Sequence, residues 1–146
     1  MILVTFESRY DESLGWDNED NVSPYISIAN PESDIQNQRQ PDEIVIPLTT
    51  IKIEYDYPLS CRVIFEHTNL AGFTRADLAR LVSQDYHHIY DEEVETSATE
   101  IGLIPGMFNR TRSNGTYGIW GHEIGDLVLR QVRQMNDNIF CVSVDS

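Results

Sequence analysis

A well-marked amphipathic helix limits what this chain can fold into, and it lies in the segment GFTRADLARLVSQDYHHIYDEE, residues 72–93. Thr74 is a typical N-cap, and Asp77 three positions later can close a capping box with it. Phe73 before the cap and Leu78 at the fourth helical position are spaced as a hydrophobic staple. The apolar stripe recurs at helical spacing, at Leu78, Leu81, Val82, Tyr86 and Ile89. The segment therefore predicts a long helix that buries one face.

The predicted helix runs into the acidic residues DEEVE, 91–95. Carboxylates near a helix C-terminus oppose the negative end of the helix dipole. We therefore expect the helix to end near residues 93–95 and to fray there, unless a cation or an Arg-bearing surface compensates.

Four strands are predicted around this helix. Residues 44–56 and 61–67 alternate apolar and polar side chains before it, and two further strand-like runs, DLVLRQVRQM and IFCVSVDS, follow it with the turn Asn136-Asp137-Asn138 between them. The order β-β-α-loop-β-β predicts an α+β domain, in which an antiparallel sheet carries one principal helix on one face.

The chain divides into two parts by composition. Residues 1–43 hold ten acids and two bases, with Pro, Asn and Gln scattered without periodicity. We interpret them as an acidic, partly irregular N-terminal segment, and residues 44–146 as the single folded domain. On this interpretation, removing residues 1–40 should leave the remainder folded.

The net charge of −14 constrains the partners. Proteins that bind a nucleic-acid backbone recruit Lys and Arg, so direct nucleic-acid binding is not expected. No apolar run has the length of a membrane span, and the first residues lack a basic, signal-like start. We expect an intracellular protein, cytoplasmic or virion-associated. Cys61 and Cys141 are interpreted as reduced thiols packed as small hydrophobes, with a disulfide between neighbouring strands as the alternative.

The helix carries two His–acid pairs at the i, i+4 spacing that suits metal ligands. The candidate ligands are His87, His88, Asp91, Glu92 and His122. The competing interpretation is a solvent-facing polar helix surface, and we expect no cofactor. His122 belongs to GHEIGD, which lacks the second His of a metalloprotease helix; it reads as a glycine-rich turn in which His122 caps backbone groups. No catalytic residue is assigned, because nucleophile motifs and phosphate loops are absent from the sequence.

A second block, NRTRSNGTYGIWGH, combines Arg, aromatic residues and glycines at residues 109–122. Such a combination is typical of an interaction hot spot. The candidate binding residues are Arg110, Arg112, Tyr117 and Trp120. The alternative is that the aromatic residues fill the core beneath the helix, and this alternative is favoured for Ile119 and Trp120.

Four motifs, GFTR, IYDEE, PGMFNR and YGIWGH, lie within residues 50–146. With them, this part of the chain resembles an uncharacterised protein family of large DNA viruses of protists and some algae. The resemblance implies a viral or protist intracellular context, with association with a virion as an expectation, and it assigns no activity.

The sequence favours a non-enzymatic interaction or structural module with a protein partner. The first alternative is a metal-dependent enzyme that uses the His–acid pairs of the helix. The second is an acidic decoy that binds basic proteins, for which salt-sensitive binding is expected.

Overall fold

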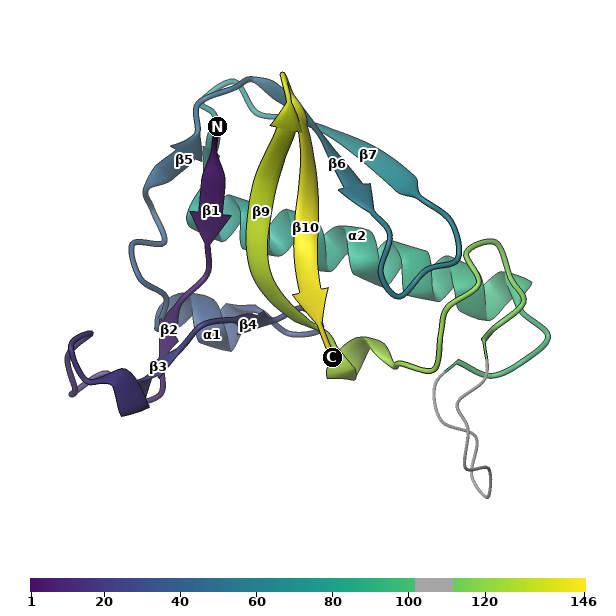
Figure 1. Cartoon of the computed structure of the whole chain (residues 1–146), viewed down its shortest axis with the longest axis horizontal. Helices are drawn as coiled ribbons and strands as arrows, with labels where there is room; N and C mark the ends of the chain where they lie inside the picture. The colour runs from purple at the N-terminus through teal and green to yellow at the C-terminus, as the bar shows by residue number, and fades with distance from the viewer. Residues whose placement is uncertain (102–111) are drawn as a thin grey trace.

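The structure, a computed structural model, describes residues 1–101 and 112–146. It is an α+β fold, in which one long helix packs against a mixed, mostly antiparallel sheet (Figure 1). The strands of this sheet are β1 (Leu3–Thr5), β4 (Ile26–Ser27), β6 (Thr50–Tyr55), β7 (Val63–Thr68), β9 (Val128–Asn136) and β10 (Ile139–Asp145). Their order is β1-β9-β10-β6-β7, and β4 pairs with β9 beside β1.

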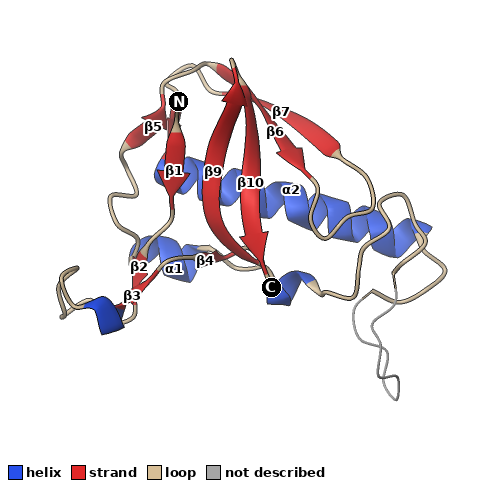
Figure 2. Cartoon of the chain, in the orientation of Figure 1, coloured by secondary structure: helices blue, strands red, loops and turns tan. Residues whose placement is uncertain are grey.

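Two short strand pairs and four helical segments complete the described fold (Figure 2). The pairs are β2 (Ser8–Arg9) with β3 (Val22–Ser23), and β5 (Ile44–Ile46) with β8 (Phe73–Thr74). The α-helices are α1 (Glu32–Gln36) and α2 (Arg75–Thr96), and the 3-10 helices are η1 (Glu19–Asn21) and η2 (Ile124–Asp126).

Helix α2 begins as the sequence predicts. The Thr74 hydroxyl accepts a hydrogen bond from the Asp77 amide, and the Asp77 carboxylate accepts one from the Thr74 amide, both at 3.0 Å. Leu78, Val82 and Ile89 are fully buried against the sheet. Leu81 is only half-buried, so it lies at the edge of the buried face of the helix and not within it. Within GHEIGD, where the sequence predicts a glycine-rich turn, the chain forms the 3-10 helix η2.

The sheet differs from the prediction in one pairing. Strand β10 pairs antiparallel with β9 but parallel with β6, with Phe140 opposite Ile53. The hairpin at Asp137, whose φ is +43°, fixes the direction of β10. Alternation of apolar residues is the same in parallel and antiparallel strands, so the sequence pattern could not reveal this pairing.

Residues 1–43 are part of the same core. Strands β1 and β4 pair with β9, and the buried side chains of this segment are Val4, Phe6, Ile26, Ile28 and Ile35. The apolar runs in residues 1–43 are short and separated by acidic loops. They therefore show no periodicity that would predict strands. The boundary after residue 43 therefore does not separate a folded unit from an appendage, and we now expect removal of residues 1–40 to destabilise the rest.

The contribution of the N-terminal strand can be measured with one substitution. Phe6 is fully buried, so Phe6→Ala should lower the free energy of unfolding in urea by about 3–5 kcal/mol. Leu3 in β1 is 55% exposed, and Leu3→Ala should change it by less than about 0.5 kcal/mol. Equal, small effects of both substitutions would show that the segment is not part of the core.

Candidate functional site

A buried carboxylate at the end of α2 organises the loop of residues 113–118. Glu93 has no solvent exposure, and four donors of the loop point at its two oxygens. The donors are the Ser113 hydroxyl at 2.6 Å and the amides of Gly115, Tyr117 and Gly118 at 3.0, 2.7 and 3.1 Å. The loop thus wraps around one negative charge, and its backbone amides are satisfied without a sheet or helix.

Further hydrogen bonds fasten the same loop to the last turn of α2. The Thr96 hydroxyl accepts from the Thr116 amide at 3.0 Å, and the Tyr117 hydroxyl donates to the Glu92 carboxylate at 2.5 Å. Asn114 accepts from the Ala98 amide at 2.8 Å with its side-chain oxygen. Helix α2 therefore continues to Thr96, because amides and hydroxyls of the loop bind its last turn. The sequence had predicted fraying at this end unless a cation or an Arg-bearing surface compensated.

These contacts shift the pKa values of two ionisable groups, Glu93 and Tyr117. Burial raises the pKa of a carboxyl, but the hydrogen bonds that Glu93 accepts outweigh it and hold the pKa of Glu93 below its ordinary value. Burial, and the hydrogen bond to Glu92, raise the pKa of Tyr117 to about 12. Glu93 is thus held charged, and Tyr117 is held as a neutral donor.

Close packing makes glycine necessary at one loop position. A Cβ on Gly115 would lie 2.5 Å from the Thr96 hydroxyl and 2.6 Å from the Glu93 carboxylate. Only a residue without a side chain lets the backbone come this close to the buried charge.

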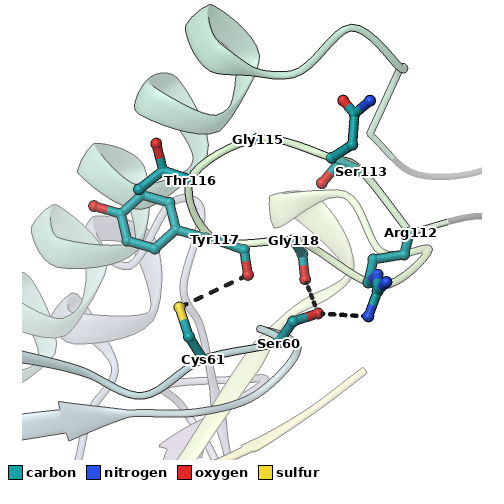
Figure 3. Close-up of a pocket in the computed structure, with 9 residues that line it drawn as sticks. Ser60, Cys61, Arg112, Ser113, Gly115, Thr116, Tyr117 and Gly118 are labelled. Carbon is teal, nitrogen blue, oxygen red and sulfur yellow. Dashed lines mark hydrogen bonds between the residues drawn. The ribbon is translucent and has the colours of Figure 1, made fainter.

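The outer side of the loop borders an open pocket of about 340 Å³ (Figure 3). Ser60 and Cys61, from the segment between β6 and β7, form the opposite wall. The Ser60 hydroxyl donates to the Gly118 carbonyl at 2.7 Å, and the Arg112 guanidinium lies 3.5 Å from the same hydroxyl. The described residues that line the pocket are mostly small and polar, and they include the Cys61 thiol and the Arg112 guanidinium.

Arg112 and Trp120 form a second feature at this loop. They pair across an isolated β-bridge, and the guanidinium lies over the indole ring at 5.4 Å from its centroid. Trp120 is 52% exposed, although the sequence favoured a core position for it. Among the described residues, no carboxylate forms an ion pair with Arg112. We call Arg112 and Trp120 the Arg–Trp pair.

The structure does not place Tyr117 or Ile119, the other described residues considered for binding in this block, on the exposed surface beside the Arg–Trp pair. Tyr117 is buried, because its ring packs toward α2 while its hydroxyl reaches Glu92. Ile119 is buried, as the sequence favoured. Arg110 lies outside the described residues. Cys61 is exposed rather than packed, and both cysteines are free thiols.

The candidate metal ligands do not gather. His87 contacts the Ala29 carbonyl at 2.8 Å, whereas His88 lies 3.5 Å from Glu92 and packs edge-on against Phe65. His122 lies 3.9 Å from Asp126. Within residues 1–101 and 112–146, no group of three or more His, Cys, Asp or Glu side chains is placed to hold a metal ion.

A hydrogen-bonded network that the sequence analysis missed lies between α2 and the sheet. The buried Asp85 carboxylate contacts the His67 ring at 2.7 Å and accepts from the Tyr55 hydroxyl. Burial raises the pKa of Tyr55 well above its ordinary value, with the charge of Asp85 adding to the effect. The network joins α2 to β6 and β7. An acidic residue within the buried stripe of the helix was its only sequence signal.

Comparison of the chain with models of protein families, with curated proteins and with solved structures finds no match. The resemblance to a viral and algal family therefore stays a prediction. In the described part of the chain, no helix has the length and apolar character needed to cross a membrane.

The role of Glu93 predicts a pH-dependent stability. Because the pKa of Glu93 is lower in the folded chain than its ordinary value of 4.5, the carboxylate stabilises the fold above that pH. This contribution is lost as the pH falls through the folded pKa. At pH 7, Glu93→Gln should lower the free energy of unfolding by at least about 2 kcal/mol, since its amide group opposes the loop donors. Near pH 3 the difference in the free energy of unfolding between the variant and the unaltered chain should be smaller.

Glu95→Gln is the matched control, because Glu95 is exposed and two residues away. It should change the free energy of unfolding by less than about 0.5 kcal/mol at either pH. A Glu93→Gln variant as stable as this control in urea denaturation at pH 7 would contradict the assigned role.

Proposed function

We propose that the chain is a non-enzymatic interaction module, and that the Arg–Trp pair is its partner-facing surface. The observation that carries the proposal is the exposure of Trp120 beneath the Arg112 guanidinium, on a loop held by Glu93. Trp and Arg are the residue types that most often dominate interface energies.

Rigidity of the loop supports this proposal. A partner that binds a loop already fixed by hydrogen bonds does not have to order it, so less of the binding energy is lost. The pocket beside Ser60 and Cys61 adds a concave surface of about 340 Å³ next to the pair. Exposed aromatic surface beside a small pocket suits an apolar side chain of a partner.

Charge limits the partner further. Arg112 offers a guanidinium fork to a carboxylate. A long acidic run would be repelled by the net charge of −14. The partner segment therefore carries a single carboxylate beside apolar side chains. The viral or virion setting stays a prediction from the resemblance alone.

A defined peptide tests this surface. The probe is a fluorescent peptide with one glutamate between two leucines, and its twin carries glutamine in place of glutamate. Arg112→Ala and Trp120→Ala should each weaken binding of the glutamate peptide at least about tenfold, as for hot-spot residues. Both variants should keep the free energy of unfolding within about 0.5 kcal/mol, since both residues are exposed.

Arg130→Ala is the charge-matched control, because Arg130 is exposed, lies in β9 and pairs with Asp145 rather than with Trp120. It should bind like the unaltered chain, and the glutamine peptide should bind at least about tenfold more weakly than the glutamate peptide if Arg112 recognises the carboxylate. Equal binding of the two peptides, or equal losses in Arg112→Ala and Arg130→Ala, would contradict the proposal.

A further inference from the structure

A second surface is built from the acidic loop of residues 10–21, which has a fixed shape. Asn21 is buried, and its side chain accepts from the Asp11 amide at 2.7 Å. The same side chain donates to the carbonyls of Asp11 and Leu14, at 2.9 and 3.2 Å. One amide group thus closes the loop, which joins β2 to β3.

Trp16 is held at the centre of this surface. The guanidinium groups of Arg9 and Arg39 lie over its ring, at 4.9 and 5.6 Å from the centroid. Arg39 in turn lies 3.4 Å from the Glu7 carboxylate. The two guanidinium groups therefore hold the indole ring in place. The charge of Arg39 is partly offset by Glu7.

Next to Trp16 lies an open pocket of about 330 Å³. Its apolar walls are Trp16, Val22 and Pro24, and its polar walls are the carboxylates of Glu7 and Glu19. This volume is at the small end of ligand pockets and suits one long side chain. Glu19 is exposed, and no hydrogen bond or ion pair joins its carboxylate to another described residue.

The charge around the pocket selects a cation. Residues 7–20 contain six acids (Glu7, Asp11, Glu12, Asp17, Glu19 and Asp20) and one base, Arg9, and with Arg39, which lies over Trp16, the net charge around the pocket is −4. A field of this sign attracts basic partners and repels acidic ones. It also extends beyond the pocket, so neighbouring basic residues of the same partner would be stabilised as well.

We propose that this surface docks a lysine-rich segment of a basic protein, with one lysine side chain in the Trp16 pocket. The four-carbon stem lies against Trp16, Val22 and Pro24, and the ammonium group pairs with Glu19 and Glu7. Lysine fits better than arginine, because Trp16 already carries two guanidinium groups and a third would lose the stacking that favours arginine. The site is independent of the Arg–Trp pair, since Figure 1 shows the β2–β3 loop and the loop beside the C-terminal end of α2 at opposite ends of the long axis.

The probe is a fluorescent peptide of alternating lysine and glycine, titrated with the full chain at low ionic strength. Its twin carries acetyl-lysine, which has the same stem without the charge. Glu19→Gln should weaken binding of the lysine peptide about fivefold, and Glu95→Gln, which removes the same charge at the far end, should change it less than about twofold. Raising the salt from about 0.05 to 0.3 M should weaken binding further.

A second readout places the peptide in the pocket. In the Trp120→Phe variant Trp16 is the only tryptophan, so its fluorescence reports the pocket directly. The lysine peptide should shift this emission, and the acetyl-lysine twin should not. Trp16→Phe, which keeps an aromatic wall, guards against loss of the loop fold and should retain part of the binding.

Three outcomes overturn the proposal. Equal losses in Glu19→Gln and Glu95→Gln would show attraction by net charge without a site. Equal binding of the acetyl-lysine twin would show a pocket for apolar side chains. Binding that leaves Trp16 emission unchanged would place the peptide elsewhere on the chain.

Discussion

The Glu93 carboxylate is the interaction on which the candidate site depends. A charge taken out of water is costly unless it is fully hydrogen-bonded, and here the four donors come from one six-residue loop. The same donors would be unsatisfied without the charge. Helix end and loop therefore stabilise each other, and the positions of Gly118, Ser60 and the Arg–Trp pair follow from that arrangement.

Helix α2 makes polar contacts near its start, at its middle and at its end. Its N-terminal cap lies beside β8, its middle holds His67 and Tyr55 through Asp85, and its last turns hold the loop. All three contacts are polar, and each sits within or next to the buried apolar stripe. Apolar packing places the helix on the sheet, whereas the Asp85 and Glu93 contacts, which reach other elements, fix its register.

The local signals of the sequence were reliable where a single residue type has one dominant use. The Thr74–Asp77 cap, the alternation at Ile51, Ile53 and Tyr55, and the turn at Asp137 are of this kind, and all three are confirmed. The parallel β6–β10 pairing and the strand before Phe6 depend on contacts between distant segments, which leave no periodic trace in a short run. Glu93 was misread for a similar reason, because an acid at a helix C-terminus is unfavourable by local rules and its partners lie 20 to 25 residues away.

The distribution of charge is compatible with the two proposed surfaces, which have opposite charge preferences, on one small domain. At an ionic strength near that of cells, charges influence one another over about 8 Å, so a net charge of −14 does not act uniformly over the molecule. The Trp16 pocket lies beside an acidic loop, whereas the Arg112 guanidinium lies over the exposed Trp120 ring. In both proposals a tryptophan contributes apolar area, and the charged residues beside it decide whether the partner segment is acidic or basic. On the two proposals together, a basic segment would bind at one end of the molecule and a different partner at the other.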